Sequence, residues 1–295
     1  MAKRRAASLA ITLLVFITYN ILNAPQAVAQ EEVSQADDPP SRYLYPSFQI
    51  GAGAFASFFN TDVRLDSGAF GLGTPINLEE DLGFDAQKFD FRGGGYVRLG
   101  RRHRIDFGYF SLSRRSDALL SEEVRFGNGL FAADTEVTAN FETRFVGAGY
   151  RYSFLAKRKV ELAASLGVSA LFLKAGMDAG ATSIFSIPLP SSARVPIVRK
   201  TSVYPLPTLG FDVAYEPVSR LILRGRAGGI YSPGIGGVTA SAADWSVSSE
   251  YFFFRNVGLG VGYNWATLNV EDYGSLSLEA RYRYSGLLIY GVFAM

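Results

Sequence analysis

The C-terminal segment alternates between two kinds of side chain, and this alternation constrains the fold more than any other feature. One parity is apolar or aromatic, as in Leu278, Tyr282 and Leu288, while the other carries Glu279 and Arg281. A period of two is typical of a β-strand with one face in an apolar environment. The pattern continues for well over ten residues, whereas strands of soluble sandwiches run about five or six. This length indicates a membrane-spanning strand whose apolar face contacts lipid and whose charged face lines a lumen.

Nine further segments alternate over lengths that suit a tilted transmembrane strand, which needs about 9–11 residues. The ten predicted strands span 47–60, 87–99, 104–115, 134–154, 159–175, 200–216, 220–232, 239–253, 257–270 and 275–294. Short links alternate with long ones, as in outer-membrane barrels with periplasmic turns and long outer loops. Closure leaves no strand edge unpaired in lipid. The sequence thus predicts an all-β fold: a closed antiparallel transmembrane β-barrel of about ten strands, with counts of eight and twelve left open.

Charged residues on the polar parity are predicted to line the lumen and to neutralise one another. The expected cross-strand pairs, set by three-residue turns at 101–103 and 217–219, are Arg98 with Asp106, Asp90 with Arg114, Glu216 with Arg220, and Asp212 with Arg224. The other predicted lumen charges are Lys88, Arg92, Glu142, Arg144, Glu161, Arg226, Asp244, Glu250, Glu279, Arg281 and Arg283. Barrels of about eight strands are just filled by their own side chains. A largely plugged lumen is therefore expected, with a narrow water path as the alternative.

The N-terminus has the pattern of a secretory signal peptide. Three basic residues at 3–5 precede an apolar run over 6–22, and Ala27-Val28-Ala29 suits signal-peptidase cleavage between Ala29 and Gln30. An uncleaved anchor is the alternative, although the run is shorter than the about 20 residues that a spanning helix needs. The predicted organisation is a signal peptide at 1–29, a periplasmic segment at 30–44, and a barrel domain at 45–295. This places the protein in the bacterial outer membrane with both termini in the periplasm.

The charge balance changes when the leader is removed. The whole chain has 29 Lys+Arg and 27 Asp+Glu, and residues 1–29 contain three of the bases and no acid. The remaining chain has 26 bases against 27 acids, a net charge of −1. A basic surface for nucleic acid is therefore not expected.

Composition also removes much catalytic chemistry. The chain has no cysteine and one histidine, which excludes thiol catalysis, cysteine-ligated metals and a lipoprotein anchor. The histidine, His103, lies in a predicted periplasmic turn. A lipid A deacylase or an omptin-like protease would need its histidine on the outer side. We therefore predict no catalytic residue, no metal ligand and no cofactor.

Two of the long loops contain features that could bind a ligand. The first has an acidic cluster that could hold calcium through hard oxygen ligands: Glu79, Glu80, Asp81 and Asp85. Its spacing differs from an EF-hand, and Asn77 followed by Glu80 favours the N-cap of a short helix instead. The second loop, 176–199, is apolar for an exposed segment. It is expected to fold as a lid over the mouth, with a receptor site as the alternative.

Four segments resemble a widespread group of Gram-negative outer-membrane β-barrel proteins. They are NLEEDLGFD at 77–85, RRHRIDFGY at 101–109, PLPTLG at 205–210 and NVGLGVGY at 256–263. The resemblance covers roughly residues 45–295 and points to the small-barrel class that includes the OmpA-like and OmpW-like proteins. It implies a barrel without a particular reaction. Members of the group usually end in an aromatic residue that the barrel-assembly machinery reads, whereas Phe293 is followed here by Ala294 and Met295.

The expected function is non-enzymatic. We expect an envelope structural protein or a narrow, gated pore for small solutes. The expected partners are outer-membrane lipid, lipopolysaccharide, periplasmic chaperones and the barrel-assembly machinery. A loop-mediated adhesin or receptor is the alternative, and a lipid-modifying hydrolase is the least favoured.

Overall fold

The computed structural model describes residues 41–295 apart from 69–70, 180–196, 236–237 and 273–275. The predicted signal peptide, its cleavage site between Ala29 and Gln30, and most of the apolar loop 176–199 lie outside the described residues. Ser41–Met295 form one folded unit, which is described by itself. Within the described part every regular element is a β-strand. No helix there is long and apolar enough to cross a membrane.

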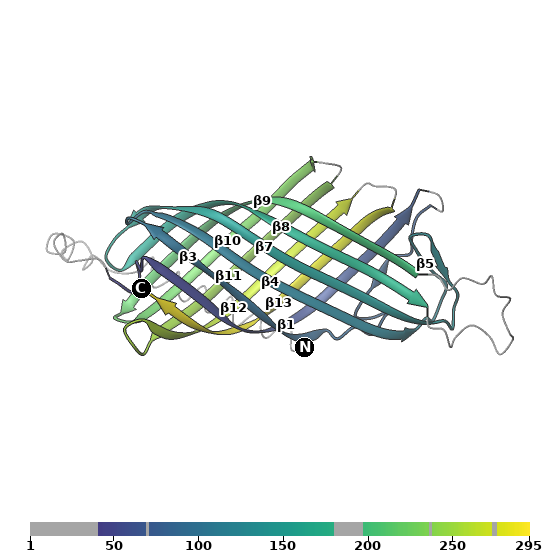
Figure 1. Ribbon diagram of the computed structural model, residues 1–295, viewed down its shortest axis with the longest axis horizontal. Helices are drawn as coiled ribbons and strands as arrows, with labels where there is room; N and C mark the ends of the chain where they lie inside the picture. Colours follow the sequence, from purple (N-terminus) through teal and green to yellow (C-terminus); the bar gives the residue numbers. More distant parts are fainter. Residues whose placement is uncertain (1–40, 69–70, 180–196, 236–237, 273–275) are drawn as a thin grey trace, which may run out of the picture. The chain divides into compact units, whose positions relative to one another are not determined.

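Ten long antiparallel strands form the barrel (Figure 1). They are β1 (Phe48–Ser67), β3 (Gln87–Leu99), β4 (His103–Leu119), β7 (Glu136–Ala156), β8 (Val160–Ala179), β9 (Ile197–Val218), β10 (Leu221–Ile235), β11 (Val238–Phe252), β12 (Val257–Asp272) and β13 (Leu276–Ala294). Strands that follow one another in this order are hydrogen-bonded neighbours, and β13 pairs with β1 from end to end. The barrel is therefore closed. The predicted ten-stranded antiparallel barrel is confirmed, and the alternative counts of eight and twelve are wrong.

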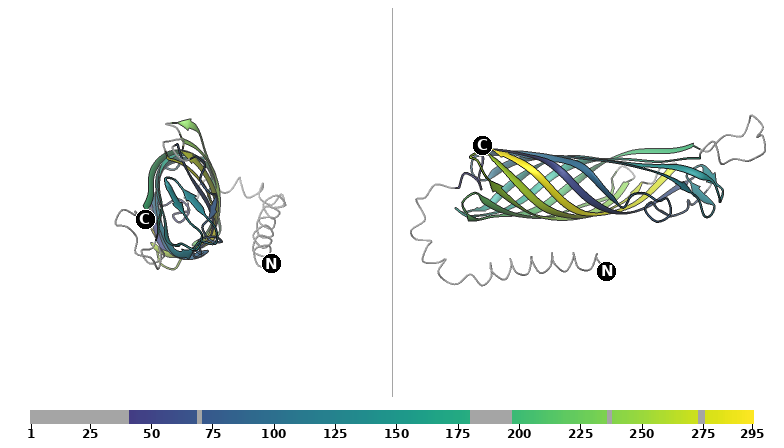
Figure 2. Two further views of the ribbon diagram at one scale, coloured as in Figure 1. Left: turned by 90° about the vertical axis from the view of Figure 1, so that its right-hand side faces the viewer. Right: turned by 90° about the horizontal axis from the view of Figure 1, so that it is seen from below.

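The two ends of the barrel differ, and Figure 1 shows both. Short links at 100–102, 157–159, 219–220 and 253–256 lie at one end together with the C-terminus. We call this the turn end. The strand ends that are joined by the long connections 68–86, 120–135 and 180–196 lie at the opposite end, which we call the loop end. Three short strands belong to the loop end: β2 (Ile76–Asn77), which pairs with β1, and the hairpin of β5 (Val124–Phe126) and β6 (Gly129–Phe131). This hairpin lies inside the ring of barrel strands (Figure 2, left).

The outward face of each strand changes character along its length, and β13 shows this well. Near the turn end its outward side chains are apolar, with Leu287 and Ile289 more than half exposed. Beyond Ser285, toward the loop end, the same face carries Arg283 and Arg281, which are also exposed. An apolar surface is stable against lipid and a charged surface is stable against water. The switch therefore marks the boundary of the membrane on this strand.

The outward faces of other strands also change from apolar to polar side chains at this level. On β1 the outward series Ile50, Ala52, Ala54, Ala56 and Phe58 gives way to Asn60, Asp62, Arg64 and Asp66. On β4 the series Ile105, Phe107 and Tyr109 gives way to Ser111, Ser113, Arg115 and Asp117. A transmembrane strand needs about 9–11 residues, whereas β7, β8 and β9 have 21, 20 and 22 residues. About half of each long strand therefore extends beyond the lipid. We call the apolar part the belt and the part toward the loop end the extension.

The interior changes in the opposite sense. In the extension the inward side chains form one continuous apolar core that includes Phe59, Leu112, Phe141, Leu173 and Tyr282. Within the belt the inward positions combine glycines and other small residues with buried charges such as Arg98, Arg151, Glu161 and Glu250. The extension is thus built like a soluble protein, because water surrounds it and the hydrophobic effect drives apolar side chains inward.

This inversion corrects one group of predictions. Glu279, Arg281 and Arg283 were predicted to line the lumen but lie on the outer surface of the extension, as do Glu142 and Arg144. The inward neighbours of the β13 charges are Ala280 and Tyr282, which are 3% and 4% exposed. The prediction applied the lipid-facing rule to whole strands. On β13 the rule fails along the whole strand: Leu288, predicted to face lipid, packs against the inward core, and the parity of Arg281 and Arg283 faces lipid in the belt and water in the extension.

Candidate functional site

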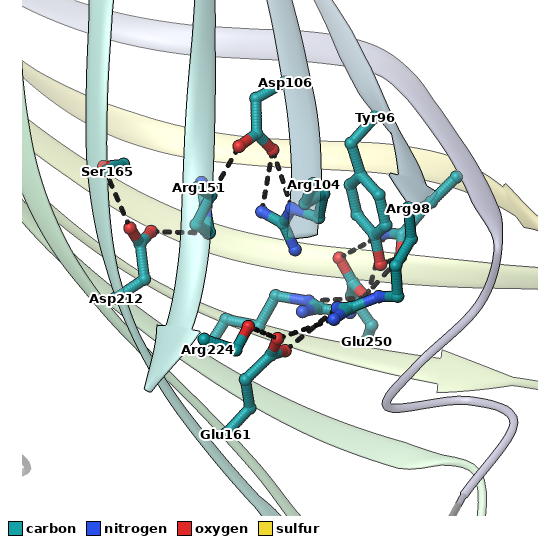
Figure 3. Close-up of polar contacts among 12 residues, drawn as sticks. Tyr96, Arg98, Arg104, Asp106, Arg151, Glu161, Ser165, Asp212, Arg224 and Glu250 are labelled. Atoms are coloured by element: carbon teal, nitrogen blue, oxygen red, sulfur yellow. Dashed lines mark hydrogen bonds and ion pairs between the residues drawn. The ribbon is translucent and has the colours of Figure 1, made fainter. Parts of the chain in front are cut away.

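The candidate site is the polar half of the lumen, inside the belt, where inward side chains from nine of the ten barrel strands meet, and Figure 3 shows its central residues. Arg98 on β3 and Glu161 on β8 form a bidentate ion pair, with N–O distances of 2.8 and 3.1 Å. Their side chains are 2% and 4% exposed. Ser153 on β7 also donates a hydrogen bond to Glu161. Since β4 and β7 separate β3 from β8, this pair crosses the lumen rather than joining neighbouring strands.

A second group forms a chain of alternating charge. The Arg104 guanidinium lies 2.8 Å from Asp106, and the other Asp106 oxygen lies 3.0 Å from Arg151 Nε. Arg151 continues to Asp212 on β9 at 2.7 Å, and Ser165 donates a hydrogen bond to the second Asp212 oxygen. Two cations and two anions therefore neutralise one another. Buried charges are tolerated when they are paired and hydrogen-bonded in this way.

A third group is centred on Glu250 of β11. Arg224 of β10 approaches Glu250 at 3.1 Å, and Gln49 of β1 donates an amide hydrogen bond to it. The Tyr290 hydroxyl donates to the first Glu250 oxygen at 2.9 Å, and the Tyr96 hydroxyl donates to Gln49 Oε1 at 2.9 Å. Strands β1, β3, β10, β11 and β13 are thereby tied together across the closure of the barrel.

The predicted cross-strand pairs are wrong in register. Arg98 lies opposite Arg104 rather than Asp106, because Leu99 pairs with His103 and the turn therefore comprises 100–102 with Gly100 at a φ of 66°. Asp106 lies opposite Tyr96 instead.

The β9–β10 hairpin departs from prediction in the same manner. Its turn comprises only Ser219 and Arg220, and a bulge follows between Leu221 and Leu223. Asp212 consequently lies opposite Arg226, and Arg224 lies opposite Ala214. Arg220 is exposed in the turn, where its backbone N–H donates to Glu216. A shift of two residues keeps every side chain on its predicted face, so alternation alone cannot fix the register.

The remaining predicted pair, Asp90 with Arg114, lies farther from the turn end. Arg114 pairs with Glu79 of the loop 68–86 rather than with Asp90. Asp90 faces inward and accepts a hydrogen bond from Ser57 at 3.4 Å. Sequence reasoning missed Arg104 and Arg151 altogether. Arg104 shares the parity of Asp106 and lies within the predicted strand 104–115, so it was identifiable on that ground.

The loop end of the lumen is filled by apolar side chains from the loops, which we call the plug: Leu78, Leu82, Phe84, Leu120, Val124, Phe126 and Phe131. The Arg114 guanidinium is buried beneath them, 4.7 Å from the centre of the Phe59 ring and hydrogen-bonded to Thr61 at 2.7 Å. Its ion pair with Glu79 fixes the loop, since Glu79 also accepts the Thr61 N–H at 2.7 Å. The space left beside the plug is about 10 Å³, less than a water molecule occupies in the liquid.

The turn end is occupied by the chain segment 41–47, which we call the latch. Leu44 is fully buried among Ala214, Ile222, Phe252 and Val292. The Tyr45 hydroxyl donates to the Lys157 and Val160 carbonyls at 2.5 and 3.0 Å. Burial raises the pKa of this phenol to about 12, and the negative charge of Glu161 adds to the rise.

The C-terminal end of the latch, Ser47, joins the barrel itself. The Ser47 N–H donates to the Met295 carbonyl at 2.6 Å, and the Arg98 N–H donates to the Ser47 carbonyl at 2.7 Å. The N-terminal segment is therefore hydrogen-bonded to both the first hairpin and the C-terminus.

Between the latch and the apolar core a cavity of about 230 Å³ remains. Its walls are formed by members of the three polar groups together with Arg226, Ser246 and Ser248.

Two further candidate features, His103 and the acidic segment after Asn77, lie at opposite ends of the barrel. His103 points outward at the turn end, where its Nδ1 lies 2.6 Å from the Tyr150 hydroxyl. The Asn77 side chain accepts the N–H groups of Glu79 and Glu80 at 3.1 and 2.9 Å, as a cap does, but residues 78–82 form turns and the predicted short helix is wrong. Among the residues that the structure describes, no group of acids or histidine is arranged to hold a metal ion.

No protein-family model and no curated protein matches the chain. Among solved structures, the outer membrane protease OmpT from Escherichia coli aligns with a TM-score of 0.50 and 9% identity, over 84% of this chain and 96% of that chain. The translocator domain of the autotransporter NalP from Neisseria meningitidis aligns with a TM-score of 0.42 and 10% identity, over 92% and 98%. OprG from Pseudomonas aeruginosa aligns with a TM-score of 0.39 and 8% identity, over 86% and 99%. At such identities the likeness concerns the fold alone.

The closed barrel, its apolar belt and the likeness in fold to OmpT agree on the class. The chain has the fold of a small β-barrel of the bacterial outer membrane, as the sequence predicted. The likeness to OmpT carries no activity to this chain.

Proposed function

We propose that this protein is a sealed, non-conducting barrel of the outer membrane that serves as a structural element of the envelope. One observation carries the proposal: the lumen is occupied along its length, by the plug at the loop end, by paired charges in the belt and by the latch at the turn end. A conducting pore needs a continuous water path, and barrels with open channels typically have about sixteen strands or more.

In this proposal the turn end and both termini face the periplasm, and the loop end faces outward. The support is the alternation of short and long connections, which matches the layout of outer-membrane barrels. The signal-like leader favours delivery by periplasmic chaperones and the barrel-assembly machinery. Lipid at the belt and lipopolysaccharide around the extension are the proposed surroundings.

The proposal includes the absence of an enzymatic role. Hydrolytic chemistry at the outer mouth would need a general base there. The one histidine of the sequence lies at the opposite end, hydrogen-bonded to Tyr150.

Conductance in planar lipid bilayers tests the proposal. Purified wild-type protein is expected to give no current steps above the lipid background. The matched variant replaces residues 68–86 by a short Gly-Ser linker, which removes the part of the plug that carries Leu78, Leu82 and Phe84. Both proteins are first shown to be folded by their heat-modifiable electrophoretic mobility. Reproducible channels in the wild type would refute the proposal, whereas channels confined to the linker variant would support it.

A second function, binding of a surface partner through the outer loops, is favoured by the extension. Strands β7, β8 and β9 continue about ten residues beyond the belt, at about 3.3 Å per residue, so their loop-end residues lie well clear of the lipid. Replacing residues 180–196 by a linker is then expected to remove binding to host cells and to leave barrel mobility unchanged. Equal binding by both proteins would exclude this role for the loop.

A further inference from the structure

The 230 Å³ cavity in the belt has a charge that the protein does not neutralise. Four arginines of the polar network, Arg98, Arg104, Arg151 and Arg224, are matched by four carboxylates, Glu161, Asp106, Asp212 and Glu250. Arg226 on β10 is a fifth cation, and it lines the cavity with no carboxylate within 4.0 Å among the described residues. Its Nε is buried and has no hydrogen-bond acceptor.

The neighbours of Arg226 explain why it stays unpaired. Its cross-strand partner on β9 is Asp212, but the two Asp212 oxygens are taken by Arg151 at 2.7 Å and Ser165 at 3.3 Å. Its partner on β11 is Ser246, a neutral hydroxyl that also lines the cavity. Two further inward acids, Glu216 and Asp244, do not line the cavity.

We propose that this cavity binds one small monovalent anion, of the size of chloride or formate, against Arg226. A buried charge without a partner is strongly unfavourable, and a bound counter-ion removes that cost. The cavity provides further donors, because Ser246, the cross-strand partner of Arg226, and Ser248 also line it. Its volume equals about eight water molecules at about 30 Å³ each, so the anion enters with part of its hydration shell. Because Arg226 is the single unpaired cation of the cavity, a monovalent anion neutralises it completely.

Equilibrium dialysis with radiolabelled formate tests the site. Each protein is refolded in detergent in the presence of formate, so that a closed lumen does not prevent entry. The wild type and Arg226→Lys are expected to bind close to one formate per chain at saturation, and Arg226→Gln none. Arg281→Gln is the matched control, because it removes an arginine from the outer surface and is expected to bind like the wild type. Heat-modifiable mobility verifies that each barrel is folded.

A second variant keeps the proposal testable if Arg226→Gln does not fold. Ser246→Asp places a carboxylate on the strand position opposite Arg226 and supplies the missing counter-charge internally. It is expected to lose formate binding and to unfold at a higher urea concentration than the wild type in formate-free buffer. The absence of saturable formate binding by the wild type, or undiminished binding by Arg226→Gln or Ser246→Asp, would overturn the proposal. These outcomes do not depend on whether the lumen conducts.

Discussion

The boundary between belt and extension can be tested by moving one arginine along the outer face of β13. Ile289→Arg places a charge inside the belt, and Leu287→Arg places one nearer its edge. Arg283→Gln removes a charge from the extension. All three positions share one outward face, so the variants differ in depth and not in orientation.

The expected magnitudes follow from strand geometry. At about 3.4 Å per residue and a tilt of about 40°, each residue advances about 2.6 Å along the membrane normal. The eight steps from Ser285 to Phe293 then cover about 21 Å, close to the about 25 Å height of an apolar barrel belt. Ile289 lies at the middle of this interval, where an arginine costs about 2–4 kcal/mol. Leu287→Arg should cost less, because the penalty falls toward the interface.

Arg283→Gln should change stability by less than about 1 kcal/mol. Its ion pair with Asp62 is 3.5 Å long and about half exposed, and exposed pairs contribute little. The assay is reversible urea unfolding in phospholipid vesicles, followed by the fluorescence of Trp245 and Trp265. A cost below about 0.5 kcal/mol for Ile289→Arg, or an equal cost for Arg283→Gln, would refute the assignment of the two zones.

Three further predictions concern the interior and the latch. Glu161→Gln should lower the free energy of unfolding by about 3–5 kcal/mol, because Arg98 would stay buried without its partner; a loss no larger than that of the exposed control Glu279→Gln would contradict this. Phe141→Ala should cost about 3–5 kcal/mol in the same assay through loss of buried area and a cavity in the extension, and a cost below about 1 kcal/mol would mean that the extension is loosely packed. The phenol of Tyr45 has a pKa raised to about 12 in the folded protein. Its contribution to the free energy of unfolding is therefore complete below pH 10 and is lost as the pH rises from 10 through about 12. Tyr45→Phe should therefore flatten the fall in stability over this range, and identical pH profiles for the two proteins would exclude the effect.

Strand positions could be predicted from the sequence because alternation is a local property. The segment predicted at 87–99 coincides with β3, and the other barrel strands were located to within a few residues, apart from loop-end extensions such as that of β1. The position of each strand is predicted from the alternation of its own residues. Closure of the barrel follows because every strand edge must be paired in lipid.

Side-chain direction could not be predicted from the same signal. A strand that alternates Arg281, Tyr282 and Arg283 looks alike whether the tyrosine faces lipid or an apolar core. The choice depends on where the lipid ends, which is set by the level of the neighbouring strands. Lumen charges within the belt were therefore placed on the correct face, and charges of the extension were not.

The pairing within the polar network could not be predicted from the sequence for a different reason. Arg98 and Glu161 come from strands that are not neighbours, so their pairing depends on the curvature of the whole barrel. Turn geometry added a second difficulty, because Arg220 adopts a φ of 73°, a conformation that favours glycine. No residue type in the 217–219 segment indicates that the turn has shifted.

The proposed function depends most on a lumen that is closed at both ends. Because the chain contains no cysteine, the accessibility of the lumen can be measured directly with introduced thiols. Ser246→Cys places the only thiol in the belt cavity, and Ser113→Cys places it on the outer surface of the extension. The rate of reaction with a small charged methanethiosulfonate reagent is measured for both folded proteins and normalised to their unfolded rates. We predict that Ser246→Cys reacts at least about a hundredfold more slowly, because its labelling requires local opening of the plug or the latch. Comparable rates for the two thiols would contradict a closed lumen.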